Sequence, residues 1–98
     1  MTYLEELESA IIKLHGVEAK YLGAVPVDEV FEGKSVWTGN VAVFAVTGHA
    51  RAKKCYAWGY PRDDGTGLSI TTVLELPPVK SAETAVKVAI AAQARKTP

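Results

Sequence analysis

Two stretches decide the expected fold: residues 36–47 read VWTGNVAVFAVT and residues 53–60 read KKCYAWGY. Both are rich in Val and aromatic residues, which favour strands, and a short polar connection lies between them. Strands joined by so short a connection can only be antiparallel. The sequence therefore predicts a β-hairpin at the centre of the chain.

Two further strands flank this pair. Residues 17–27 alternate between two sets of side chains with period two, and Pro26, which has no backbone N–H for a ladder, suits an edge strand. Residues 68–76 follow a turn-rich loop at 61–67 and form the fourth strand. The sequence predicts a four-stranded antiparallel meander in chain order.

A helix is predicted at each end of the chain. Thr2 and Glu5 have the spacing of a capping box, apolar residues recur at helical spacing as far as position 14, and Gly16 suits the residue that follows a helix. Ser81 is a good N-cap for a second helix over 82–96. Residues 1–98 are thus expected to form one α+β domain, a two-layer α-β-β-β-β-α fold with both helices on one face of the sheet.

Composition narrows the classes of function. Eleven Lys and Arg balance eleven Asp and Glu, so no overall charge draws the chain to nucleic acid or to a membrane surface. The one cysteine excludes an internal disulfide, and no apolar run is long enough to span a membrane. A soluble, cytoplasmic protein is the expectation.

The third strand has two different faces. One face, the small stripe, carries the small residues Cys55, Ala57 and Gly59, and the other face, the aromatic stripe, carries Tyr56, Trp58 and Tyr60. The second helix is rich in Ala and matches the small stripe. If the helices cover the small stripe, the aromatic stripe lies on a helix-free face, near Phe44 of the central strand. The alternative is that the aromatic residues are core beneath the helices, because a period of two does not say which face is covered.

An open aromatic face motivates the leading functional hypothesis. Large exposed rings normally mark a partner or ligand site, so we expect a non-catalytic homo-oligomeric or partner-binding module, with a homodimer as the expected oligomer. Its candidate binding residues are Trp37, Phe44, Tyr56, Trp58 and Tyr60. The second hypothesis is a small-ligand pocket rimmed by Trp37, Tyr56 and Trp58.

Two weaker hypotheses rest on the connection before the third strand. A possible anion site there comprises His49, Arg51, Lys53 and Lys54, and with the neighbouring rings it could bind single-stranded nucleic acid, although the neutral chain disfavours this. Cys55 and His49 could form a catalytic pair oriented by Asp63 or Asp64, which ranks last. No ligand spacing indicates a metal, and no cofactor is predicted.

One pattern resembles a known group of proteins. Residues 37–44 follow W-x-G-x-V-x-V-F, residues 48–49 are G-H and residues 55–58 are C-Y-A-W. This pattern resembles that of small uncharacterised bacterial proteins. The resemblance implies a bacterial, cytosolic origin and brings no activity with it.

Overall fold

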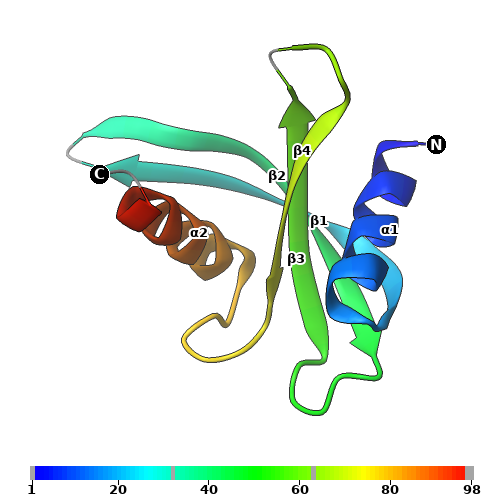
Figure 1. Cartoon of the computed structure of the whole chain (residues 1–98). Coiled ribbons are helices and arrows are strands. Elements are labelled where there is room, and N and C mark those ends of the chain that lie inside the picture. The colour runs from blue at the N-terminus through cyan, green and yellow to red at the C-terminus, as the bar shows by residue number, and fades with distance from the viewer. Residues whose placement is uncertain (1, 32, 63, 97–98) are drawn as a thin grey trace.

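The chain folds as a four-stranded antiparallel sheet with one helix at each end of the sequence (Figure 1). The computed structural model describes residues 2–31, 33–62 and 64–96. Its elements are α1 (Tyr3–His15), β1 (Glu18–Phe31), β2 (Lys34–Thr47), β3 (Lys54–Pro61), β4 (Leu68–Leu74) and α2 (Ala82–Lys96). The strands lie in the order β1-β2-β3-β4. The predicted α+β element order and antiparallel meander are confirmed, while β1 runs four residues further than predicted.

Both helices begin with the caps that the sequence predicts. The Thr2 hydroxyl accepts the backbone N–H of Glu5 at 3.2 Å, and the Glu5 carboxylate accepts the N–H of Thr2 at 3.2 Å. Gly16 ends α1 in the left-handed conformation, with φ of 63°. At the start of α2, the Ser81 hydroxyl accepts the N–H of Thr84 at 3.2 Å. Neither of the described helices is long and apolar enough to cross a membrane.

The two helices lie on opposite faces of the sheet (Figure 1). Leu7 and Ile11 of α1 pack on the face that carries Cys55, whereas Ala85 of α2 packs on the face that carries Trp58. The prediction of two layers with both helices on one face is therefore wrong. The central strands explain the difference, because β2 and β3 are apolar at both parities, and a strand of that kind needs cover on both sides.

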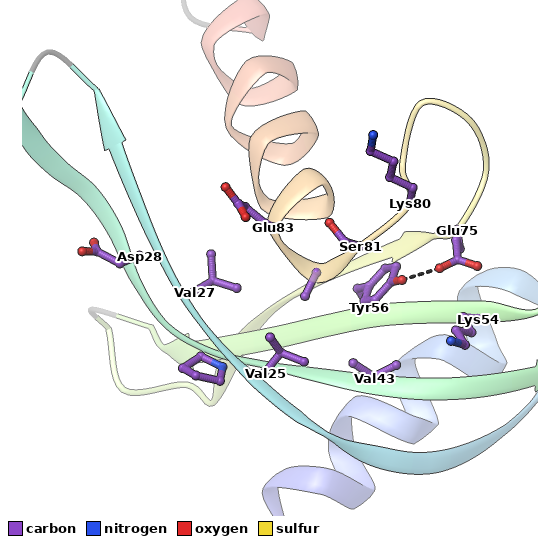
Figure 2. Close-up of a pocket in the computed structure, with 12 residues that line it drawn as sticks. Val25, Val27, Asp28, Val43, Lys54, Tyr56, Glu75, Lys80, Ser81 and Glu83 are labelled. Carbon is purple, nitrogen blue, oxygen red and sulfur yellow. Dashed lines mark hydrogen bonds between the residues drawn. The ribbon is translucent and has the colours of Figure 1, made fainter.

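On one face, α2 covers most of the aromatic stripe. Tyr56 and Trp58 are buried there with Val27, Val41 and small residues of α2. Figure 2 shows Tyr56 and Val27 on the side of the sheet from which α2 starts. The Ala-rich surface of α2 thus lies against large side chains rather than against the small stripe, because small residues on one layer leave room for rings on the other.

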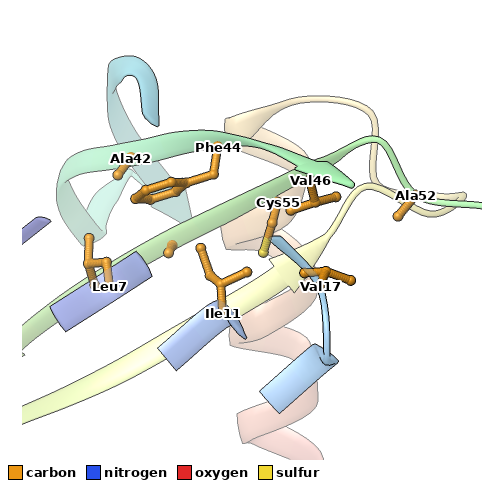
Figure 3. Close-up of a cluster of buried hydrophobic side chains, with 9 residues drawn as sticks. Leu7, Ile11, Val17, Ala42, Phe44, Val46, Ala52 and Cys55 are labelled. Atoms are coloured by element: carbon orange, nitrogen blue, oxygen red, sulfur yellow. The ribbon is translucent and has the colours of Figure 1, made fainter. Parts of the chain in front are cut away.

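On the other face, α1 covers the small stripe (Figure 3). Phe44 of β2 is fully buried there beside Leu7 and Ile11, and it lies directly opposite Cys55 in the β2–β3 register. Residues directly opposite one another in an antiparallel pair share a face. Phe44 is therefore not near the aromatic stripe, and its prediction as a binding residue on that face is wrong.

A β-bulge in β1 reverses the faces of that strand. Tyr21 pairs with Phe44 but Gly23 pairs with Val43, so Leu22 is the extra residue between the two pairs. Before the bulge, odd-numbered residues such as Tyr21 face α1; after it, odd-numbered residues such as Val27 face α2. The unbroken alternation predicted for residues 17–27 is wrong for this reason.

The β1–β2 hairpin separates from β3 halfway along its length. β2 pairs with β3 over four residues, 42–45, and within the described residues no strand pairs with that side of β3 beyond Ala57. Tyr3 of α1 replaces the missing partner, because its hydroxyl accepts the N–H of Gly59 at 2.9 Å and donates to the Gly59 carbonyl at 3.3 Å. Glu32, part of the turn predicted between β1 and β2, lies outside the described residues.

Candidate ligand-binding groove

An apolar groove lies between α2 and the paired strands β3 and β4. Its cavity volume is about 1040 Å³. Rings from β2 and β3 line one side and aliphatic residues of α2 line the other: Trp37, Trp58 and Tyr60 against Val86, Ala89 and Ile90. Small-molecule sites have this character, with apolar walls and a volume of several hundred Å³.

The two tryptophans of the sequence meet in this groove. The rings of Trp37 and Trp58 contact edge to face, with centroids 5.6 Å apart and planes at 63°. Trp37 also lies over Gly39, where an added Cβ would come within 3.1 Å of the indole ring. Because Gly39 has no side chain, the indole of Trp37 can lie over it and contact Trp58.

The structure brings together three of the five residues predicted for binding. Trp37, Trp58 and Tyr60 line the groove, and Tyr60 is 51% exposed while Trp58 is 5% exposed. Tyr56 lines a different pocket, and Phe44 lies on the opposite face. The α2 wall was not predicted, because the pattern of α2 does not tell which face of the sheet the helix covers.

The second pocket lies at the start of α2, beside Tyr56, and has a volume of about 540 Å³ (Figure 2). The Tyr56 hydroxyl donates to the Glu75 carboxylate. Burial raises the pKa of Tyr56 above its ordinary value, and the hydrogen bond to Glu75 and the charge of Glu75 raise it further. Lys54 and Lys80 line this pocket together with acidic residues, so it has no single sign of charge.

The four predicted anion-binding residues do not form one site. His49 supports the turn in which it lies, because its Nδ1 accepts the backbone N–H of Arg51 at 3.0 Å and of Ala52 at 2.9 Å. Arg51 and Lys53 are exposed on the connection, whereas Lys54 lines the pocket beside Tyr56. The nucleic-acid hypothesis also loses two of its stacking rings, since α2 covers Tyr56 and Trp58.

Cys55 is a core residue. Its side chain is fully buried in the α1 cluster, and its thiol contacts the Tyr56 carbonyl at 3.7 Å. Burial raises the pKa of the thiol to about 11, so the nucleophilic thiolate does not form at neutral pH. Asp64 accepts the N–H and the hydroxyl of Thr66, at 3.0 and 2.6 Å, and Asp63 lies outside the described residues.

The histidine that does contact the sheet is His15, which the sequence did not single out. Its Nε2 lies 2.8 Å from the Thr72 hydroxyl of β4. Burial lowers the pKa of His15, and the charge of His49 lowers it further. His15 therefore joins the end of α1 to the outer strand of the sheet.

We expect Cys55 to be inert in the folded protein. An aromatic disulfide reagent at pH 8 should label it at least a hundredfold more slowly than in 6 M guanidinium chloride, because the buried thiol is protonated. The measurement is the release of the coloured thiol over time. Fast labelling of a sample with native circular dichroism would contradict the buried position.

Comparisons with known proteins bring no relative. No family model matches the chain, and no curated protein and no solved structure matches it. Function therefore has to be inferred from the residues and the geometry of the groove.

Proposed function

We propose that this protein is a binding module that takes a small, uncharged, largely apolar ligand in the groove between α2 and β3–β4. One observation carries the proposal: a cavity of about 1040 Å³ into which Trp37, Trp58 and Tyr60 converge from one side and the aliphatic face of α2 from the other. Aromatic and aliphatic walls of this kind bury most of a small ligand's surface.

The lining supports an uncharged ligand. Of the described residues that line the groove, none carries a fixed charge, and His15 at one end has a lowered pKa that favours its neutral form. A charged ligand would leave water without gaining an ion pair, and that transfer is costly. The hydroxyls of Ser69 and Thr71 can orient a neutral polar group.

A wide protein interface on this face fits the structure less well than a small ligand. A dimer through helix-free aromatic faces needs Tyr56 and Trp58 to be open, and α2 covers both. The part of this sheet face that α2 leaves open is the groove, not a wide flat surface. The groove thus supports the small-ligand hypothesis, and a homodimer has to use another surface.

The groove can be tested with a neutral solvatochromic dye, Nile red. Because Trp37 and Trp58 are the two tryptophans of the chain, quenching of tryptophan emission reports on the groove alone. We expect saturable dye enhancement and tryptophan quenching with the same midpoint. Ala89→Leu, which places a larger side chain on the α2 wall of the groove and narrows it, should weaken dye binding at least tenfold.

Ala91→Leu is the matched control. It adds the same side chain to the exposed side of α2 and should leave the dye affinity within twofold of wild type. Near-ultraviolet circular dichroism must stay native in both variants, because loosely packed states also bind apolar dyes. Equal affinities in the two variants, or no saturable binding by the wild-type protein, would contradict the proposal.

A further inference from the structure

The two outer strands of the sheet differ in how well their free edges are protected from pairing with other strands. β1 carries the bulge at Leu22, a proline at position 26 and charged residues such as Lys20. These are the features with which proteins prevent edge-to-edge association. β4 reads LSITTVL, with no charge and no proline, and its register with β3 runs unbroken from Leu68 to Leu74. β4 is the unprotected edge.

The backbone groups that β4 presents can be identified from its partner strand. Gly59 directs its N–H and C=O away from β4, toward Tyr3. Ile70 lies opposite Gly59, so in the alternating pattern of an antiparallel ladder the N–H and C=O of Ile70 point outward. The same alternation directs those of Leu68 and Thr72 outward. Among the described strands, β4 pairs only with β3.

We propose that β4 pairs antiparallel with the β4 of a second copy of this chain, so that the two sheets become one continuous sheet. The register that pairs all seven residues of β4 places the two-fold axis at Thr71. Ile70 then lies opposite Thr72 of the partner copy, and both have outward-facing backbone groups, as a hydrogen-bonded pair requires. An edge without charges is self-complementary in this arrangement, because no like charges meet across the axis.

The two helices flank the β4 edge of the sheet (Figure 1). Figure 1 looks onto the β4 edge: β4 crosses in front of β3, and α1 and α2 stand to either side. The groove itself continues over this edge, because its lining passes from Thr71 on the α2 face to Thr72 on the α1 face. A second copy paired at β4 would close the open side of the groove. The pairing does not depend on what the groove binds.

The first test is the oligomeric state measured by sedimentation equilibrium. We expect wild-type protein at 100 µM to have twice the 10.5 kDa mass of the chain. Thr71→Lys should be monomeric under the same conditions, because two lysines would face each other across the axis. Thr71→Glu should behave likewise, and an equimolar mixture of the two variants should restore a dimer of mixed composition.

The second test fixes the register through disulfide formation. Opposite residues that do not exchange backbone hydrogen bonds lie about 4.5 Å apart at Cα, within reach of a disulfide. Oxidised Thr71→Cys should therefore form a covalent dimer. Ser69→Cys is the control, since four residues of strand, about 14 Å, would separate the two copies of position 69. Cys55 is buried and does not compete.

Three results would overturn the proposal. One is a monomeric wild-type protein at 100 µM, another is a dimer that both charged variants leave intact, and the third is equal cross-linking of the two cysteine variants. If the charged variants fail to fold, the cross-linking comparison decides alone. If the wild-type protein is monomeric and still binds Nile red, the proposed β4 pairing is wrong and the proposed binding function is unaffected.

Discussion

Deleting Leu22 is expected to leave the protein folded, and the Leu22 side chain itself is 53% exposed. Leu22 is the extra residue of the bulge, and its neighbours Tyr21 and Gly23 already pair with consecutive residues of β2, so its removal turns the bulge into a regular ladder. Tyr21 then stays opposite Phe44, and Val27 stays in the cluster beneath α2. Turning such side chains to the wrong face would cost about 1.5 to 3 kcal/mol each, and the deletion avoids this cost because no residue changes face.

Leu22→Ala is the control for this deletion. It keeps the bulge and removes an exposed side chain, so it should change the free energy of unfolding by no more than about 0.5 kcal/mol. Urea denaturation followed by far-ultraviolet circular dichroism measures both variants. An unfolded deletion variant would contradict this expectation, and would show that β1 needs the bend of the bulge as well as its register.

The bulge also shows how far a sequence pattern can lead. The caps at Thr2 and Ser81 are local interactions between residues three apart, and both form as the sequence predicts. The meander is nearly as local, because each strand pairs with the next one along the chain. A bulge leaves the alternation of residue types intact while it exchanges the two faces. Nothing in residues 17–27 marks Leu22 as the point where the exchange occurs.

The layer arrangement failed to follow from the sequence for a related reason. The small stripe and the aromatic stripe of β3 were both identified, but both are apolar, and two apolar faces permit cover on either side or on both. Trp37, Trp58 and Tyr60 were found because large rings stand out in a sequence. The α2 wall of the groove was missed because it depends on where a distant helix packs, which its own small residues do not specify.

Trp58→Ser is the substitution that most directly tests this placement of α2. Trp58 is 5% exposed and packs against Trp37 beneath the helix, so we expect a loss of about 3 to 5 kcal/mol in the free energy of unfolding. Tyr60→Ser is the matched control on the same stripe, since Tyr60 is 51% exposed and should cost less than about 1 kcal/mol. Guanidinium denaturation of both variants gives the comparison. Equal, small losses in both variants would mean that Trp58 is as open to solvent as Tyr60. In that case α2 would not cover the aromatic stripe, and the open sheet face predicted from the sequence would again be the expected surface for a partner.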